Sequence, residues 1–433
     1  MGFSGSVNKF RLLFGRVWGI IVRNTVIRQT RYEVTRIMLK RLEIDNFKTL
    51  NRFAMDFSPM TVIVGNNASG KSTILQVLSM LSSCVQEDFP AFFDRRGWNV
   101  SELRSKCKGR LEKVLRVAAE IEITADGRSC LLRWEMQLQY DLQRNSFLLM
   151  SERVQNMESE QILLEFSEMG GALFGRSEDP LYYPQMILES SLMKVALNVH
   201  TMGGIFPELA ELKRFLTRMR SYELLSPDQM RTSSRGRAEY LSISGKNLPI
   251  YLKSLPEEKK DNFLLKLKKL LGDKIERVST ETRGKPGWVY MVVEEKYEKA
   301  KYRISSGHLS DGLLRLLAIV AISESKNCSM SMLDEIENGI NSSYAEGLIG
   351  IFRDMSGDGT QMVLTTHSVV FLDYVEKDEI VFLYRSETDG STKAVRIFDT
   401  PELAERLEYM YPGEIIYNLG NQELVELCMQ HMG

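Results

Sequence analysis

The chain has 433 residues, of which 43% are hydrophobic, and its formal net charge is −1. This length allows one large domain or two of medium size, and the composition is that of a globular protein with a substantial core. The near-neutral charge gives no global sign of a nucleic-acid or membrane partner. No apolar run reaches the roughly 18 residues that a membrane-spanning helix needs.

Cysteine and histidine usage argues against metal clusters and disulfide frameworks. The five cysteines are scattered without a C-x-x-C pair, and the four histidines are equally dispersed. Zinc sites and disulfide-rich secreted domains require closely spaced cysteines. We therefore expect a reduced protein of the cytoplasm.

Residues 1–37 form a basic leader. Lys and Arg are frequent from Met1 to Lys40, whereas Glu33 is the single acid of that stretch. The segment lacks a clean apolar centre and a small-residue cleavage site, which disfavours a secretory signal. Either it is disordered or translation starts at Met38, where an orderly strand pattern begins; an interfacial helix or targeting sequence is the alternative.

Strands and one helix are expected in the first half, residues 38–183. Residues 38–57 alternate apolar and polar side chains, which predicts two short strands joined by a turn. The run TVIVG is typical of a buried strand, and the apolar stripe after it predicts a helix over 69–83. Further strands are expected over 116–142, with a hairpin turn at 126–128, and over 147–155 and 161–168.

A largely helical insertion is expected over residues 184–275, with a polar break at 228–238. Its helices are expected at 191–199, 206–225 and 248–272, and strands follow at 274–280 and 287–297. In the last part, residues 276–433, helices and strands then alternate. That alternation predicts a parallel sheet flanked by helices. The helices are expected at 309–323 and 342–355, and the strands at 330–336, 361–366 and 379–386.

GNNASGKST at 65–73 is a complete G-x-x-x-x-G-K-[ST] phosphate loop between a strand and a helix. Its glycines let backbone N–H groups surround the phosphates, and the helix N-terminus adds positive potential. Lys71 can neutralise the β- and γ-phosphates of ATP, and the Ser72 hydroxyl can bind Mg²⁺.

MLDE at 332–335 is an apolar run that ends in two acids. Such a pair suits a metal-contacting carboxylate, Asp334, beside a base, Glu335, that orients the attacking water. Glu337 is close enough to compete for the second role, although an acid at a helix start is the simpler interpretation of it.

LSDGLLR at 309–315 is first of all typical of a helix N-cap, with Ser310 or Asp311 as the capping residue. The segment opens a helix upstream of Asp334, and TTHS places His367 downstream of Asp334, after a further apolar strand. This order and spacing resembles the signature motif and switch histidine of ABC ATPases. GNNASGKS, LEIDNFKTL, LDEIENG and LTTHS look like the RecF/SMC branch, and the chain is similar to stand-alone bacterial ATPases related to the OLD family, many of which act in antiphage defence.

The resemblance implies an α/β fold: an ABC-type P-loop ATPase head, with a mixed sheet flanked by helices and an inserted, largely helical subdomain. Asp334 would support the metal, Glu335 would be the catalytic carboxylate and His367 would contact the γ-phosphate. Ser310 and Gly312 would reach the γ-phosphate bound by a second chain, so that a homodimer holds two composite sites. The residues implied to hold ATP and Mg²⁺ are Gly65, Asn67, Gly70, Lys71, Ser72 and Thr73.

The chain departs from the family pattern at several positions. Serines interrupt the strand SMSML, Ile336 replaces a common Pro, and Asn341 stands where His is frequent. The glutamine of the usual Q-loop has no clear counterpart, with Gln86 as the one candidate. His308 is interpreted as incidental, and the basic groups at 228–238 and 258–269 are either solvated helix faces or DNA contacts.

Three functions remain open on the sequence. The first is an ATP-driven engine that controls a separate effector in antiphage defence, with a RecF-like DNA-repair role as its variant. The second is a self-contained nuclease, disfavoured because the segment 368–433 after His367 is too short for a nuclease domain and lacks a D-x-D cluster. The third is a nucleotide-binding scaffold with little turnover. We favour the first.

Overall fold

The computed structural model describes residues 37–107, 112–175, 179–196, 204–282, 286–325 and 327–431. The expected basic leader lies outside these residues, apart from Ile37 at its end. Every helix within the described residues is too short or too polar to cross a bilayer.

A six-stranded, mostly parallel sheet forms the centre of the described chain. Its order is β10-β15-β16-β3-β17-β18, and β18 alone runs antiparallel to its neighbour. These strands are β3 (Met60–Gly65), β10 (Met219–Tyr222), β15 (Met330–Leu333), β16 (Gln361–Thr366), β17 (Ile380–Arg385) and β18 (Thr392–Val395). Parallel strands buried on both faces have continuous apolar runs, which explains why TVIVG and QMVLTT show no alternation.

The two faces of this sheet contribute to two different hydrophobic cores. Val62 and Val64 of β3 belong to one core, whereas Ile63 between them belongs to the other. On β16, Leu364 and Val363 divide in the same way. Because successive side chains of a strand point to opposite faces, a single apolar run is a wall of both cores.

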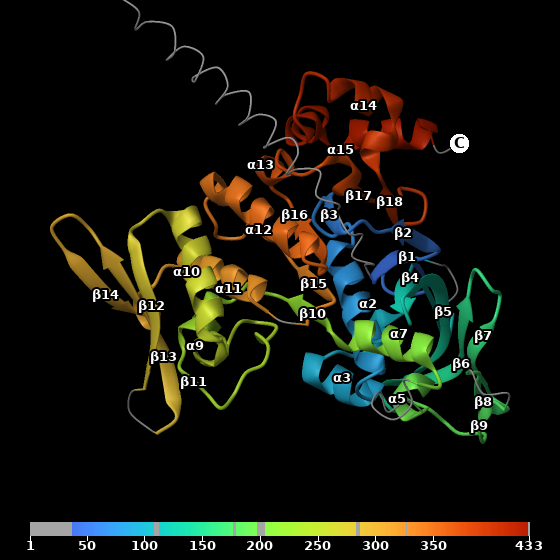
Figure 1. Ribbon diagram of the computed structural model, residues 1–433. Coiled ribbons are helices and arrows are strands. Elements are labelled where there is room, and N and C mark those ends of the chain that lie inside the picture. The colour runs from blue at the N-terminus through green and yellow to red at the C-terminus, as the bar shows by residue number, and fades with distance from the viewer. Residues whose placement is uncertain are drawn as a thin grey trace, which may run out of the picture. The chain divides into compact units, whose positions relative to one another are not determined.

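Helices cover both faces of the sheet (Figure 1). On one face, α2 contacts β3, β10 and β16, and α7 packs on α2; on the other face, α12 contacts β3 and β16, with α11 beside it. The helices around the sheet, on both of its faces, are α2 (Lys71–Cys84), α3 (Phe89–Arg96), α4 (Val100–Leu103), α5 (Leu192–Ala196), α7 (Pro207–Thr217), α11 (Asp311–Ser323), α12 (Ala345–Gly357) and α13 (Val369–Leu372).

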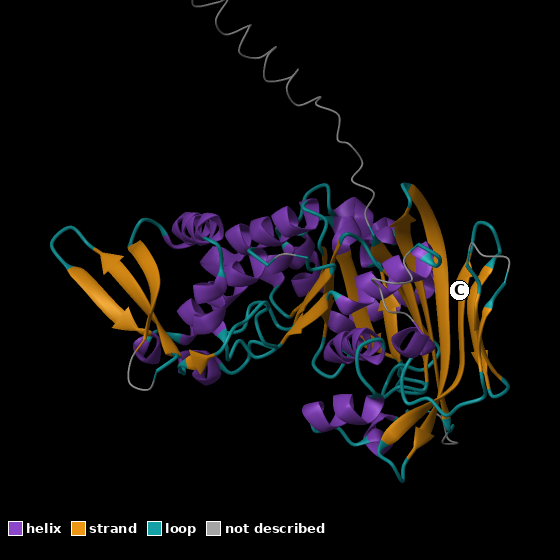
Figure 2. Ribbon diagram, turned by 60° about the horizontal axis from the view of Figure 1, so that its bottom comes forward, coloured by secondary structure: helices purple, strands orange, loops and turns teal. Residues whose placement is uncertain are grey.

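An eight-stranded antiparallel sheet packs against the α2 side, in the order β2-β1-β4-β5-β6-β7-β8-β9. Figure 2 shows its long strands beside the helical layer. The β4–β5 turn has positive φ at Asp126 (50°) and Gly127 (75°), the pattern of a type I′ hairpin. The strands are β1 (Met38–Asp45), β2 (Phe53–Asp56), β4 (Val114–Ala125), β5 (Arg128–Asp141), β6 (Ser146–Asn156), β7 (Ile162–Ser167), β8 (Gly170–Leu173) and β9 (Leu181–Tyr183).

A third lobe is built from the chain between β10 and α11, seen at the left of Figure 1. It combines three helices with a small sheet in which β13 pairs with β11, β12 and β14. Its elements are α8 (Pro227–Arg231), β11 (Ser234–Arg235), α9 (Leu248–Ser254), α10 (Glu257–Leu271), β12 (Ile275–Thr282), β13 (Trp288–Lys296), β14 (Lys301–Ser305) and the 3-10 turn η1 (Ser306–His308).

The end of the chain adds helices to the second core. α15 packs on α13 and has a non-helical residue, Gly420, at a kink. The remaining elements are η2 (Ser342–Tyr344), η3 (Lys377–Glu379), η4 (Ile397–Asp399), α14 (Pro401–Arg406) and α15 (Pro412–His431).

The structure confirms the expected fold class, a helix-flanked mixed sheet with an inserted subdomain. The helix expected over 206–225 is wrong in its second half. α7 ends at Thr217, and Met219–Tyr222 form strand β10, which pairs in parallel with β15. Tertiary pairing at the sheet edge overrides a segment whose own pattern is compatible with a helix.

Candidate functional site

The parallel sheet brings three motifs to one edge. Leu333 of β15 lies opposite Leu364 of β16, and Leu364 lies opposite Val62 of β3. The phosphate loop begins at the last residue of β3, the acid pair follows β15, and TTHS spans the end of β16. Because parallel strands end at the same side of the sheet, the motifs converge at a position where α/β proteins bind ligands.

The phosphate loop is a tight turn that packs against Thr392, the first residue of β18. Gly70 precedes α2 with φ 110°, and a Cβ at this position would lie 2.6 Å from the Thr392 hydroxyl oxygen. The Thr392 hydroxyl also donates to the Ser69 carbonyl over 2.8 Å. Gly70 is thus required both for its backbone conformation and for this close approach.

Lys71 lies folded into the loop. Its side chain is buried, and Nζ donates to the carbonyls of Gly65 (2.8 Å) and Asn66 (2.9 Å). Burial lowers the pKa of Lys71, and the nearby carboxylates of Asp334, Glu335 and Glu337 oppose this shift. The cation and the acids therefore share one electrostatic environment.

The loop fits a bound phosphate chain. Asn66, Asn67 and Ala68 are exposed, whereas Ser69 and Gly70 are buried. The buried Ser69 hydroxyl has no hydrogen-bond partner among the described residues. Ser72 and Thr73, half-buried in the first turn of α2, place two hydroxyls near the positive end of that helix.

Thr365 holds the acid pair in place. Its hydroxyl donates to Asp334 Oδ1 over 2.5 Å and accepts from the Glu335 backbone N–H over 2.8 Å. Glu335 has a left-handed backbone, with φ 48°, and its Oε2 accepts from Asn338 Nδ2 over 3.1 Å. Residues held in such conformations concentrate at functional sites.

The interpretation of Glu337 as a helix-start acid is wrong. Glu337 lies in a turn, and in the described chain the next helical segment, the 3-10 helix η2, starts only at Ser342. Its carboxylate instead accepts from the Thr366 hydroxyl (2.8 Å) and from the His367 backbone N–H (2.6 Å). Glu337 therefore fixes the backbone of His367, which is itself exposed.

The signature residues lie at the start of α11. Ser310 is exposed, and its hydroxyl oxygen accepts from the Leu313 N–H over 3.3 Å, so the expected capping role is present and the hydroxyl proton stays free to donate. A Cβ on Gly312 would lie 2.5 Å from the Gly339 carbonyl oxygen. Ser310 and Gly312 line a hollow of about 420 Å³, together with Asn341, Tyr344 and Tyr297.

This hollow contains none of the phosphate-loop residues. Within one chain, Lys71 lies near the carboxylates of Asp334 and Glu335, whereas Ser310 and Gly312 line a hollow that none of these three residues lines.

A buried arginine, Arg315, connects α11, the signature helix, to residues 334–339, the acid loop that follows β15. Arg315 donates to the carbonyls of Leu224 (2.9 Å) and Leu225 (3.1 Å), and to both the backbone and side-chain oxygens of Asn338. Asn338 in turn contacts Glu335. Sequence reasoning missed Arg315, Asn338 and Thr365, because each acts through contacts that no local pattern records.

Gln86 is excluded as a site residue. It follows the 14-residue helix α2, which is about 20 Å long, so it lies at the far end from the phosphate loop. Its amide donates to the carbonyl and hydroxyl of Ser82.

The residues that depart from the family pattern have local partners. Ser331 in β15 is buried with its hydroxyl 3.3 Å from the Cys328 sulfur, and Ile336 is buried. Asn341 caps η2 by accepting from the Ser343 N–H over 2.9 Å.

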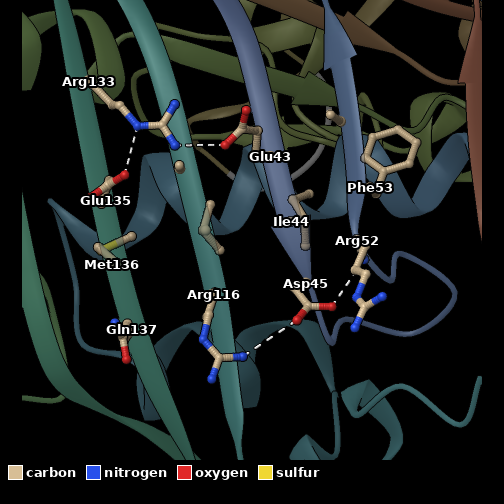
Figure 3. A pocket seen from close by; sticks show the side chains of 13 residues that line it. Glu43, Ile44, Asp45, Arg52, Phe53, Arg116, Arg133, Glu135, Met136 and Gln137 are labelled. Atoms are coloured by element: carbon tan, nitrogen blue, oxygen red, sulfur yellow. Dashed lines mark hydrogen bonds and ion pairs between the residues drawn. The ribbon is translucent and has the colours of Figure 1, made fainter. Parts of the chain in front are cut away.

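A second hollow of about 420 Å³ lies on the open face of the antiparallel sheet (Figure 3). Arg133 pairs there with Glu43, Glu120 and Glu135, each at 2.7–2.8 Å, and Arg116 lies 3.5 Å from Asp45. Since these charges neutralise one another across neighbouring strands, the hollow is a ladder of ion pairs rather than a second anion site.

Two family models match the chain. One, described as "AAA ATPase domain", matches residues 38–173, and the other, described as "AAA domain, putative AbiEii toxin, Type IV TA system", matches residues 208–373. A protein of Thermus scotoductus described as "OLD nuclease" is 30% identical over 96 residues. That alignment covers 17% of this chain and 18% of the relative, so the chain matches about a fifth of the relative's length.

Among solved structures, the chain is similar to heads of SMC proteins. An SMC head bound to the C-terminal winged-helix domain of ScpA is 16% identical, with 82% of this chain and 96% of that chain covered and a TM-score of 0.47. The SMC head domain from Thermotoga maritima is 14% identical, with 82% of this chain and 98% of that chain covered and a TM-score of 0.42. An SMC head domain with an extended coiled coil, from Pyrococcus furiosus, is 15% identical, with 86% of this chain and 100% of that chain covered and a TM-score of 0.44.

The first matched region contains the phosphate loop, and the second contains the signature, the acid pair and the switch histidine. With the nucleotide motifs divided in this order over the two matched regions, the chain is similar to AAA ATPase domains in both halves and, over a short stretch, to an OLD nuclease.

Proposed function

We propose that the protein binds and hydrolyses ATP with Mg²⁺, and that two copies close on the nucleotide as a homodimer. The observation that carries this proposal is the separation of the motifs. Lys71, Asp334 and Glu335 share one edge of the sheet, whereas Ser310 and Gly312 line a hollow to which none of these three residues contributes. A second chain is the source of the missing half of each site.

The residues of one chain divide the work of binding and chemistry. The phosphate loop, with Gly65, Asn67, Gly70 and Thr73, would hold the triphosphate through backbone and hydroxyl groups, and Lys71 would exchange its loop carbonyls for phosphate oxygens. Ser72 and Asp334 would hold Mg²⁺. When bound, Mg²⁺ supplies charge neutralisation at the phosphates.

Glu335 and His367 would act at the γ-phosphate. Glu335 would orient and polarise the attacking water, because Asp334 is engaged by the Thr365 hydroxyl whereas the described hydrogen bonds of the Glu335 carboxylate occupy only Oε2. His367 would contact the γ-phosphate, from a backbone position that Glu337 holds.

Ser310 and Gly312 would complete the site of the opposite chain. The Ser310 hydroxyl retains a proton to donate, and the N-terminus of the 13-residue helix α11 favours a negative ligand. ATP then links the two chains, and hydrolysis releases them.

The described packing bears on the domain division. α5, α7 and β10 contribute to the head, so we place the start of the insertion after Tyr222 rather than at residue 184. In this proposal, residues 223–308 read a cue or dock a partner.

We assign the protein to the cytoplasm and to antiphage defence, with the effector on a separate protein. The toxin and OLD descriptions of the similar families support that direction. The alternatives are a RecF-like repair ATPase and a scaffold with little turnover, which ATPase rates measured with and without DNA separate. Of the basic groups offered for DNA, Lys259 and Lys266 pair with Glu324, and Arg231 pairs with Asp228, which favours solvated structural roles.

Glu335→Gln tests the proposal. The amide retains hydrogen bonding but loses the charge that polarises water, so ATP should bind and persist. We expect an ATP- and Mg²⁺-dependent dimer, stable enough for light scattering, and turnover reduced at least about 100-fold. Lys71→Ala should abolish nucleotide binding itself.

The double variant Glu335→Gln, Ser310→Arg is the control for the composite site. Bulk and charge at the junction should remove the dimer without removing nucleotide binding, and the melting temperature verifies that the lost N-cap leaves the fold intact. A Glu335→Gln protein that binds ATP and stays monomeric would refute the composite site.

A further inference from the structure

The signature helix begins with a carboxylate. Asp311 is the first residue of α11, directly after Ser310, and its side chain is 57% exposed. An acid in the first helical turn is favourable for an isolated helix, because it complements the helix dipole. In the proposed dimer, however, the same helix end receives the γ-phosphate held by the other chain. Two groups of negative charge then meet at one helix terminus.

Arg231 of α8 neutralises this carboxylate within the chain. Its guanidinium forms an ion pair with Asp311 and donates to the Leu309 carbonyl over 3.0 Å. It also lies 2.6 Å from Asp228, and its side chain is 23% exposed. The contacts to Leu309 and Asp311 flank Ser310 on both sides.

The backbone of Arg231 is tied to the turn that leads into the signature. The Ser306 hydroxyl donates to the Arg231 carbonyl over 2.9 Å, and α8 contacts both η1 and α11. Arg231 therefore comes from the inserted lobe, whereas the residues that it holds belong to the signature.

Arg315, one turn further along α11, attracts the Asp311 carboxylate electrostatically but forms no ion pair or hydrogen bond with it in the described contacts. Its described hydrogen bonds go inward, to Leu224, Leu225 and Asn338. Arg231 is therefore the cation that directly faces Asp311 in the described contacts.

We infer that Arg231 is a positioning residue that neutralises the signature carboxylate Asp311 and so makes closure on the second chain's ATP depend on the position of the inserted lobe. The inference rests on the proposed ATP-dependent dimer. A partner that draws residues 227–231 away would leave Asp311 without its ion-pair partner beside a triphosphate. The resulting repulsion would weaken the dimer without any change at the phosphate loop.

The test measures the dissociation constant of the ATP-bound dimer in the Glu335→Gln background, by analytical ultracentrifugation. Arg231→Ala should raise this constant about tenfold or more, since like charges at an interface repel strongly. Adding Asp311→Asn should restore it, because the carboxylate that needs neutralising is gone. Arg237→Ala removes an exposed cation of the same lobe and should leave the constant unchanged.

Salt separates electrostatics from structure. The deficit of Arg231→Ala should shrink when the salt concentration rises from about 0.05 M to about 0.5 M, because the screening length falls severalfold. Asp311→Asn alone should dimerise at least as tightly as its parent. This single variant keeps the test decisive even if Arg231→Ala folds poorly.

Two results would overturn the inference: no rescue by Asp311→Asn, or a deficit that salt does not change. Either would make Arg231 a purely structural contact. A parent Glu335→Gln protein that binds ATP but never dimerises would instead overturn the proposed function on which the inference rests.

Discussion

Thr365 links Asp334, the proposed metal ligand, to Glu335, the proposed catalytic carboxylate, through a single hydroxyl. Thr365→Val removes that hydroxyl at nearly constant volume, so Asp334 loses a donor and the Glu335 N–H loses its acceptor. Groups that orient metal ligands typically contribute about 10–100-fold to metal affinity. We therefore expect the Mg²⁺ concentration needed for half-maximal turnover to rise about 10–100-fold, measured by Mg²⁺ titration. Thr365→Ser should stay near the original value, and an unchanged Mg²⁺ requirement in the Val variant would contradict this role.

Asn338 acts on the other side of Glu335, through the hydrogen bond to Oε2. A hydrogen bond to a charged group contributes about 1.5–3 kcal/mol, which corresponds to roughly tenfold or more in rate. Asn338→Ala should therefore lower kcat about tenfold and leave the KM for ATP nearly unchanged. Gln86→Ala is the matched amide control and should leave both constants unchanged, since the described hydrogen bonds of the Gln86 side chain go only to Ser82. Equal effects of the two variants would contradict the assignment.

At the scale of elements, the approach of α11 to the acid loop depends on the absence of a side chain at Gly312. An added Cβ would lie 2.5 Å from the Gly339 carbonyl oxygen, so Gly312→Ala must push the helix and the loop apart. Such overpacking typically costs about 1–3 kcal/mol. We expect a lower melting temperature and a weaker ATP-dependent dimer.

Gly350→Ala in α12 is the matched control for that substitution. No atom lies within 4 Å of a Cβ built on Gly350, and the residue is inside a regular helix. This variant should raise the free energy of unfolding by about 0.5–1 kcal/mol, because Ala is the better helix former. Destabilisation of both variants alike would show that the effect at Gly312 is not one of close approach.

At the scale of the whole described molecule, the two cores share the parallel sheet as a common wall. Leu81 lies in one core and Leu348 in the other, and both are buried. Leu→Ala substitutions in cores cost about 2–5 kcal/mol. Ile63 and Val62 are neighbours on one strand but face different cores. Unfolding of either core would therefore remove the packing of the strand that the other core needs. We expect Leu81→Ala and Leu348→Ala each to lower the midpoint of a single unfolding transition, measured by circular dichroism on heating. Two separate transitions, each shifted by only one of the variants, would contradict this cooperativity.

The local motifs could be predicted from the sequence because their information is contiguous. The phosphate loop needs a buried strand, glycines and a helix start close together, and residues 60–84 contain all three. The Asp334–Glu335 pair, the helix after LSDG and the strand before His367 are recognisable for the same reason. The hairpin at Asp126 and Gly127 is likewise encoded in its own turn residues.

Only the tertiary structure decided which of these residues act on one another. Strand β10 became a strand through pairing with β15, a distant part of the chain, against a pattern that also suits a helix. Glu337 was interpreted as a helix-start acid, yet its carboxylate binds the backbone of His367, which lies beyond the next helix and strand. Arg231 and Asp311 are 80 residues apart in sequence and meet at the start of α11. Single side-chain contacts over such separations leave no periodicity in the chain, so packing alone selects them, whereas periodicity and loop chemistry are written locally.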